Sequence, residues 1–259
     1  LSSAASDVYK RQMEQVVRDM VGRSITEYYP GRTNEPGEIV LEVKNFCQEG
    51  LFNNISFKLR KGEILGVAGL MGAGRTEIMR ALFGVDSCKH GEVYLHGKKV
   101  CIKKPEDAIK AGIGFITENR KSEGLILDFS ISRNIALPSV DTFAKRSVIN
   151  AKNETAFSEA LSKKLGVKTA SIDLEAGALS GGNQQKVVIA KWIGMNPSII
   201  IMDEPTRGID VGAKRDIYDL MNELTSQGVA IIMVSSELPE VIGMSAVSYT
   251  HLTLPTIRL

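Results

Sequence analysis

A glycine-rich loop, written GLMGAGRT, lies between the apolar run GEILGVA and the segment EIMRALFG. It matches the phosphate-binding pattern G-x-x-x-x-G-K-[ST] at every fixed position except the lysine, which is Arg75 here. Glycines let the backbone turn its amides toward an anion, a helix that starts here adds its positive end, and Thr76 can direct a hydroxyl at Mg²⁺. A glycine-rich strand–helix turn without a ligand is the alternative for the loop alone. The candidate phosphate-binding residues are Gly69, Leu70, Met71, Gly72, Ala73, Gly74, Arg75 and Thr76.

A second segment, SIIIMDEP at Ser198–Pro205, is an apolar run that ends in two acidic residues. A strand of this kind places its carboxylates at the carboxyl edge of a sheet, where α/β proteins bind ligands. We expect Asp203 to hold Mg²⁺ through its hydration shell and Glu204 to deprotonate a water molecule aimed at a terminal phosphate. A general base of this sort contributes roughly 10²–10⁴-fold to a rate. A strand followed by a polar turn is the alternative.

The third segment is LSGGNQQK, which begins at Leu179. Ser180 can cap a helix that runs through QQKVVIAKWIG, and the two glycines after it expose amides at the positive end of that helix. The segment therefore predicts a second anion site, although a capped helix without any ligand is the default for these residues alone.

The bulk composition fits a globular protein and excludes several classes. The chain has 259 residues, of which 43% are hydrophobic and 24% charged, so it can form a packed core. A net charge of +2 gives no electrostatic footprint for nucleic acid. The three cysteines lack metal-ligand spacing and suit a reducing compartment. No apolar run approaches the roughly 20 residues that span a bilayer, so we expect any membrane role to come through a partner.

Strand patterns alternate with helix patterns along most of the chain. This alternation predicts an α/β fold with a largely parallel, buried sheet. Residues 131–167 are mostly helical in pattern and suggest an inserted subdomain. Both ends have unrelated compositions, so we expect residues 1–12 and 246–259 to be a non-native leader and tail; two ordinary disordered tails are the alternative. Strands are expected at 39–46, 54–59, 63–69, 91–97, 112–118, 198–205 and 229–236, and helices at 13–23, 76–84, 105–112, 184–194 and 213–228.

The order of a glycine loop, LSGGNQQKV and MDEPTRGID resembles an ABC-type ATPase domain. Together with TENRKSEGL and VSSELPEVIGMS, these motifs resemble the second nucleotide-binding domain of the double-domain ATPase subunit in bacterial monosaccharide importers, of which the ribose importer is the familiar case. The resemblance covers about residues 13–245. It implies a P-loop NTPase of ABC type, with a mostly parallel sheet core, an antiparallel β part and an inserted helical subdomain at about 122–190. Residues 37–245 would form this ATPase domain, and 13–36 would be the tail of a preceding ATPase domain plus a linker.

The resemblance also implies how the site is shared, with ATP and Mg²⁺ as the expected cofactors. In this family each ATP lies between the glycine loop of one domain and the LSGG segment of the other. The residues that this adds to the site are Glu77, Ser180, Gly181, Gly182, Gln184 and Asp210 as nucleotide contacts, Glu118 near the metal and Ser236 near the terminal phosphate.

Four of these positions depart from the pattern of an active site. Arg75 replaces lysine, Glu77 replaces a hydroxyl residue, Glu118 replaces a glutamine that senses Mg²⁺, and Ser236 replaces a histidine. Arginine and lysine are not equivalent at a phosphate site. No clear aromatic platform for adenine precedes the loop; Phe46 and Phe52 are the nearby candidates. We therefore expect the glycine loop to bind nucleotide with slow or no turnover, and LSGGNQQ to complete a competent site on the first domain. The alternative is that Arg75 and Glu204 suffice for hydrolysis.

The function that the resemblance implies is ATP hydrolysis that drives sugar import. The expected partners are a first ATPase domain of the same polypeptide, a transmembrane sugar permease that docks on Glu118–Asn134, and, indirectly, a periplasmic or extracellular sugar-binding protein. The expected location is the cytoplasmic face of the bacterial membrane. Two other classes stay open: a soluble ABC ATPase that acts on ribosomes or DNA, which the charge disfavours, and a scaffold that binds nucleotide without hydrolysing it.

Overall fold

The computed structural model describes residues 29–30, 35–69, 72–88, 90–145, 148–245 and 247–248. The expected leader at 1–12, the helix at 13–23, most of the linker and nearly all of the tail at 246–259 lie outside these residues. Leu70 and Met71 of the glycine loop also lie outside them.

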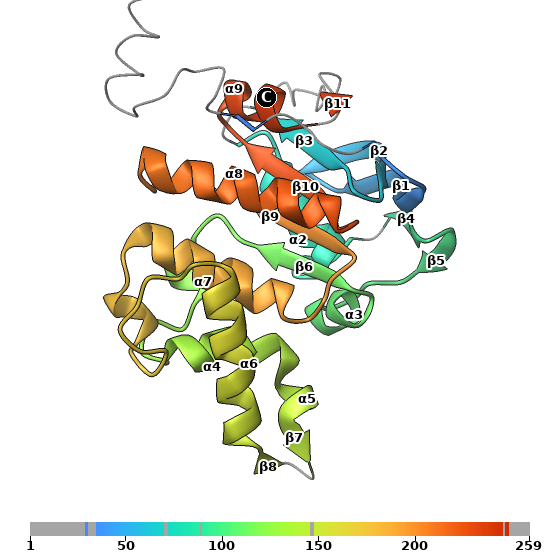
Figure 1. Ribbon diagram of the computed structural model, residues 1–259. Coiled ribbons are helices and arrows are strands. Elements are labelled where there is room, and N and C mark those ends of the chain that lie inside the picture. The colour runs from blue at the N-terminus through green and yellow to red at the C-terminus, as the bar shows by residue number, and fades with distance from the viewer. Residues whose placement is uncertain are drawn as a thin grey trace, which may run out of the picture.

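A five-stranded parallel sheet forms the centre of the fold, in the order β11-β3-β10-β9-β6. Its long strands are buried, which explains why they read as nearly continuous apolar runs. Figure 1 shows helix α8 in front of β9 and β10, with α2 behind them. The strands are β3 (Ile64–Ala68), β6 (Ile113–Ile116), β9 (Ile199–Asp203), β10 (Ala230–Ser235) and β11 (Val247–Ser248). The helices that pack near this sheet are α2 (Arg75–Phe83), α3 (Pro105–Lys110), α7 (Gly181–Ile193), α8 (Val211–Ser226) and α9 (Leu238–Met244).

A separate four-stranded sheet is antiparallel and has the order β2-β1-β4-β5. Buried and exposed residues alternate along β2, as expected for a sheet with one face on the core. The strands are β1 (Ile39–Gln48), β2 (Phe52–Arg60), β4 (His90–Leu95) and β5 (Lys98–Val100).

The helices between β6 and β9 form a lobe at one end of the molecule, which Figure 1 shows below the parallel sheet. We call α4–α7, residues 131–193, the helical lobe. Trp192 joins the lobe to the sheet region because its ring meets the edge of Phe83 at 5.6 Å between centroids. The elements of the lobe are α4 (Ile131–Ala136), η3 (Leu137–Ser139), α5 (Val140–Phe143), β7 (Ala144–Lys145), β8 (Val148–Ile149), α6 (Ala151–Lys164), η4 (Ala176–Ala178) and α7 (Gly181–Ile193); the turn η2 (Arg120–Gly124) precedes it.

The predicted fold class is confirmed: a mostly parallel core, an antiparallel part and an inserted helical region are all present. The region 131–167 is interrupted by the β7–β8 hairpin, which its helical pattern did not indicate. Strand β5 and helix α9 were not predicted either. Elements of two or three residues carry too little periodicity to be detected, and α9 is a seven-residue helix whose segment, LPEVIGM, contains both proline and glycine.

Candidate functional site

The glycine loop connects β3 to α2, as its sequence pattern predicts. Gly74 stands at the N-cap position of α2 with φ of 81°, and Gly72 has φ of 79°. This left-handed conformation favours glycine. A side chain at Gly74 would also lie 3.1 Å from the Leu51 carbonyl oxygen. No side chain among the described residues caps the start of α2, so its first amides are available to a ligand.

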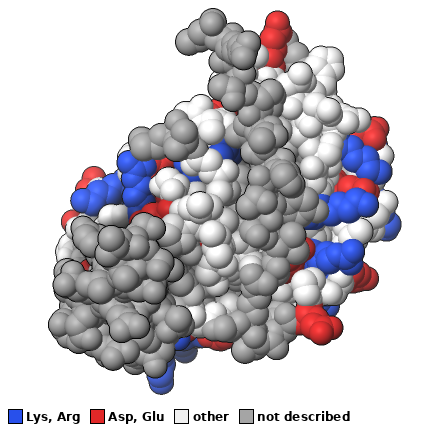
Figure 2. Space-filling model, turned by 90° about the horizontal axis from the view of Figure 1, so that it is seen from above, with Lys and Arg blue, Asp and Glu red and all other residues white. Residues whose placement is uncertain are grey.

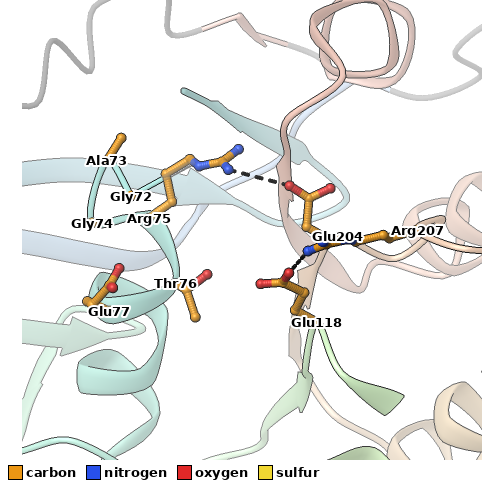
Figure 3. A pocket seen from close by; sticks show the side chains of 9 residues that line it. All are labelled: Gly72, Ala73, Gly74, Arg75, Thr76, Glu77, Glu118, Glu204 and Arg207. Atoms are coloured by element: carbon orange, nitrogen blue, oxygen red, sulfur yellow. Dashed lines mark hydrogen bonds and ion pairs between the residues drawn. The ribbon is translucent and has the colours of Figure 1, made fainter. Parts of the chain in front are cut away.

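The loop opens onto a cavity of about 200 Å³ at the carboxyl edge of the parallel sheet (Figure 3). Side chains reach it from the start of α2, from the segment after β6 and from the loop after β9. All of its lining residues except Arg207 were candidates from the sequence. The lining residues are Gly72, Ala73, Gly74, Arg75, Thr76, Glu77, Glu118, Glu204 and Arg207.

Arg75 points across the cavity at Glu204, which Figure 3 shows as a dashed contact. The distance from Arg75 Nη2 to Glu204 Oε1 is 3.4 Å, and the two side chains are only 7% and 9% exposed. The same carboxylate oxygen accepts a hydrogen bond from the backbone amide of Ser236 at 2.8 Å. Glu204 has φ of 47°, an uncommon value for a residue with a side chain. The candidate base is therefore held by a cation and an amide at once.

Asp203 is the most deeply buried acid of the site, with 1% of its surface exposed. Burial raises the pKa of this carboxyl to about 6, and the nearby Thr76 hydroxyl opposes part of that rise. Neither carboxylate oxygen of Asp203 meets the distance and angle limits of a hydrogen bond in the described part of the chain. The contact with Thr76 is therefore electrostatic proximity rather than a formed hydrogen bond.

The unpaired atoms of the site indicate what it could bind. Within the described part of the chain, Arg75 Nη1 is a buried donor without a partner, and the two Asp203 oxygens are buried acceptors without one. An anion beside Arg75 and a cation beside Asp203 would satisfy both. Among the described residues no three His, Cys, Asp or Glu side chains cluster closely enough to hold a metal alone. This donor set fits Mg²⁺, which binds through one or two protein oxygens together with phosphate oxygens and water.

Glu118 and Arg207 form a second ion pair at the mouth of the cavity. Sequence reasoning missed Arg207 although it lies inside the quoted motif MDEPTRGID. Figure 3 shows Glu77 on the side of the α2 start that faces away from Glu118 and Glu204, so these like charges are kept apart.

The LSGG residues lie outside this cavity. Ser180 stands at the N-cap of α7, but its hydroxyl makes no capping bond, so that part of the prediction is wrong. The hydroxyl instead accepts a hydrogen bond from the Asn183 side chain at 3.0 Å. Gln184 is buried and donates to the Ala176 carbonyl at 3.3 Å.

The start of α7 packs against the start of α8. A methyl group on Gly182 would lie 2.9 Å from the Ala213 side chain, and a methyl group on Gly181 would lie 3.4 Å from the Gly208 carbonyl oxygen. Asp210 caps α8 by accepting the Ala213 amide at 2.9 Å. The LSGG segment and the loop after β9 are therefore in direct contact.

The two candidate aromatic platforms face inward. Phe46 and Phe52 stack on each other at 5.5 Å and are each 5% exposed, so neither ring is free to stack on a base. Leu51, next to the glycine loop, is 44% exposed and is the apolar side chain available there.

The described surface carries mixed charge on the face seen in Figure 2, where Lys and Arg side chains lie beside Asp and Glu side chains. Within the described residues, every helix is too short or too polar to cross a bilayer.

Comparison with known proteins places these features in context. The family model described as ABC transporter matches residues 52–207. The ribose import ATP-binding protein RbsA of Bacillus licheniformis is 61% identical over 231 residues, which are 89% of this chain and 47% of that protein. The protein of the same name from Bacillus subtilis is 60% identical over 240 residues, or 93% of this chain and 49% of that protein. The chain thus spans about half the length of these relatives.

Solved structures share the fold at low sequence identity. A nucleotide-free ATP-binding cassette from an ABC transporter has a TM-score of 0.67 at 21% identity, covering 80% of this chain and 85% of that one. A dimeric ATP-binding cassette in a post-hydrolysis state with ADP and phosphate has a TM-score of 0.64 at 23% identity, covering 78% and 89%.

Proposed function

This chain belongs to the ABC transporter family, and on that premise we propose that it is an ATP-binding, ATP-hydrolysing domain that couples hydrolysis to the import of a monosaccharide such as ribose. The observation that carries the proposal is a set of buried atoms near the glycine loop that have no hydrogen-bond partner among the described residues: one Arg75 donor and both Asp203 oxygens. They call for an anion and a cation side by side, which is the chemistry of a metal-bound phosphate chain. The choice of ribose as the example sugar is taken from the names of the relatives, which are ribose import ATP-binding proteins.

Each residue has a role in this proposal that its position supports. Backbone amides of the loop and the start of α2 bind phosphate oxygens, and Arg75 neutralises their charge. Thr76 and Asp203 would hold Mg²⁺, which when bound offsets the negative charge of the phosphates. Glu204 orients and deprotonates the attacking water, and Ser236 fixes the Glu204 carboxylate through its backbone amide.

We further propose that turnover in this site is slow. Glu204 can act as a base only when it is free to face water, and here it is paired with Arg75 at 3.4 Å. A nucleotide must therefore draw Arg75 away before the base is released. Glu118 is likewise occupied by Arg207. These pairings agree with the departures from an active pattern at positions 75, 118 and 236.

The LSGG segment is proposed to complete a second ATP site on a partner domain. None of its residues lines the glycine-loop cavity, which supports a nucleotide that is shared between two domains. The cavity of about 200 Å³ is also smaller than the roughly 300–1,000 Å³ of typical ligand pockets, as half of a shared site would be. The chain spans about half the length of these relatives, which leaves room for a first ATPase domain in the same polypeptide. In this proposal residues 37–245 form the second.

Partners and location follow from the same proposal. A membrane permease would dock on Glu118–Asn134, and a sugar-binding protein outside the membrane would deliver the sugar to it. Two apolar side chains of this segment, Ile126 and Phe129, are 41% and 38% exposed, which supports a docking role. The domain would then lie at the cytoplasmic face of the bacterial membrane.

The test uses this chain with Mg-ATP. Binding is followed with a fluorescent ATP analogue, and phosphate release is measured on the same sample, with Glu204→Gln as the blank. Glu159→Gln on the exposed surface of α6 is the matched control for loss of one carboxylate. We expect binding with release close to the blank. An absence of Mg-dependent binding would refute the proposed function.

The non-hydrolytic scaffold is the second candidate, because the Arg75–Glu204 pair also suits a site that never turns over. The two candidates separate when the chain is paired with the first domain. If the assembled transporter still imports sugar when this chain carries Glu204→Gln, the scaffold is favoured. If import is lost, a hydrolysing site is favoured.

A further inference from the structure

The turn η2 connects the cavity to the LSGG helix. It begins two residues after Glu118, which lines the cavity, and Asn119 caps it by accepting the amides of Lys121 and Ser122 at 3.2 and 3.3 Å. Its first residue is Arg120, whose guanidinium lies between the loop after β9 and the start of α7.

Arg120 lies against two segments with one side chain, the loop after β9 and the start of α7. Its Nη1 donates to the Arg207 carbonyl at 2.9 Å, and its Nη2 donates to the Gly208 carbonyl at 3.1 Å. The same Nη2 would lie 2.7 Å from a methyl group on Gly181, so only glycine fits there without displacing the guanidinium. The planar fork of arginine suits two adjacent carbonyl acceptors, and the single amine of lysine does not.

The other end of η2 is fixed to α7. Lys191 is buried and donates from Nζ to the Gly124 carbonyl at 3.0 Å. Gly124 packs closely on Val188, since a methyl group on it would lie 3.1 Å from a Val188 methyl. The end of η2 is therefore fixed to the carboxyl-terminal half of α7, while Arg120 at its beginning lies against the start of that helix, so we expect a displacement of η2 to shift the start of α7.

Arg207 links this assembly to the cavity. Its carbonyl is held by Arg120, and its side chain pairs with Glu118. A phosphate would attract Arg207, and a cation would attract Glu118, so an occupant of the cavity competes with their ion pair. Any resulting shift of Arg207 would move its own carbonyl, to which Arg120 donates a hydrogen bond.

We propose that Arg120 is a positioning residue that couples the occupancy of the glycine-loop cavity to the placement of the LSGG segment at 180–184. This inference rests on the proposed function for the identity of the occupant. Its consequence is that the two halves of different ATP sites carried by this chain respond to each other through one guanidinium.

Hydrogen–deuterium exchange on the full 259-residue chain tests the inference, with Arg120→Gln as the variant. Arg60→Gln is the matched control, because Arg60 also donates to a backbone carbonyl, that of Gly37 at 3.1 Å, but lies on β2. Without ligand, we expect at least tenfold faster exchange of amides at 180–186 and 207–210 in Arg120→Gln, and unchanged exchange in β9 and β10. Arg60→Gln should leave all four segments unchanged.

The change in amide exchange on adding Mg-ATP distinguishes coupling from a purely structural role of Arg120, which would leave that change unaffected. In the wild-type chain, Mg-ATP should slow exchange at 207–210 and at 180–186 together. In Arg120→Gln the response at 180–186 should be lost while the dissociation constant changes less than threefold. Arg120→Lys keeps the charge but can donate well to only one of the two carbonyls, so it should retain part of the response. This variant also allows the test to be made if Arg120→Gln unfolds.

Three results would overturn the inference: a full response at 180–186 in Arg120→Gln, unchanged exchange there without ligand, or faster exchange spread through the sheet. A wild-type chain that binds no Mg-ATP would refute the proposed function and with it the coupling. The ligand-free comparison would then still decide whether Arg120 holds the two segments.

Discussion

Replacing Asp203 by asparagine is expected to make the ligand-free protein more stable at neutral pH. Asp203 is 1% exposed at the end of β9, and its carboxylate oxygens have no hydrogen-bond partner in the described chain. Asparagine has nearly the same shape without the charge. We therefore expect Asp203, the proposed Mg²⁺ ligand, to lower the free energy of unfolding whenever the metal is absent.

The size and pH dependence of the gain follow from the pKa. Burial raises the pKa of Asp203 from 3.8 to about 6, so between these values the folded chain binds a proton more tightly than the unfolded chain does. The unfolding free energy of the wild type therefore falls as pH rises from about 4 to about 6 and is level above that range with respect to this group. Because a tenfold change in proton affinity is worth about 1.4 kcal/mol, the loss is at most about 3 kcal/mol.

Urea unfolding at pH 4.5, 6 and 7.5, without nucleotide or Mg²⁺, measures this difference. The single tryptophan, Trp192, is 8% exposed and packs on Phe83, so its fluorescence reports loss of the core. We expect Asp203→Asn to exceed the wild type by about 1–3 kcal/mol at pH 7.5 and by about a third of that amount at pH 4.5. Glu159→Gln, an exposed carboxylate on α6, should show no such trend.

Two results would refute the reasoning. One is an Asp203→Asn chain that is no more stable than the wild type at pH 7.5. The other is a gain that is equally large at pH 4.5, where the wild-type carboxyl is mostly protonated. Saturating Mg-ATP should remove the gain by stabilising only the wild type, and its binding to the wild type should weaken below about pH 6.

Three further substitutions probe other parts of the molecule. Gly66→Ala should lower the unfolding free energy by about 1–3 kcal/mol, because the new methyl would lie 2.6 Å from Val241 Cγ1; an unchanged urea midpoint would contradict this packing. Asp210→Ala should cost about 1 kcal/mol by the same assay, because its carboxylate caps α8 through the Ala213 amide, and Asp210→Asn should lose less. Arg75→Lys should raise steady-state phosphate release by less than the roughly 100-fold that a fully freed base contributes; complete recovery would mean that the other departures matter little.

The sequence could predict which segments meet at the site because strand order in a parallel sheet brings their carboxyl ends to one edge. The glycine loop and the two acids at the end of β9 were identified separately, and β10 lies between their strands, with Val234 opposite both Val67 and Asp203. That adjacency follows from the fold, so the motifs sufficed to place Thr76 near Asp203.

The pairings inside the site could not be predicted in the same way. Arg207 reaches Glu118 only because the chain turns back after β9, where its amide bonds to the Glu204 carbonyl at 3.1 Å. The direction of the Arg75 side chain depends on Glu204, a residue far along the chain. Ser180 lost its predicted capping role to a competing donor, Asn183, three residues later. That competitor was visible in the sequence, whereas the two arginine pairings were not.

The strand order also determines when this site can exist during synthesis. Among the described strands, β3 pairs only with β10 and β11, and both follow the entire helical lobe in the chain. The antiparallel sheet, complete by Val100, can assemble on the ribosome early. The glycine loop that follows β3 must wait for nearly all of the domain to emerge. A nascent chain that stalls before β10 would expose the apolar edges of β3 and β9, so we expect the proposed nucleotide-binding edge to form late in synthesis.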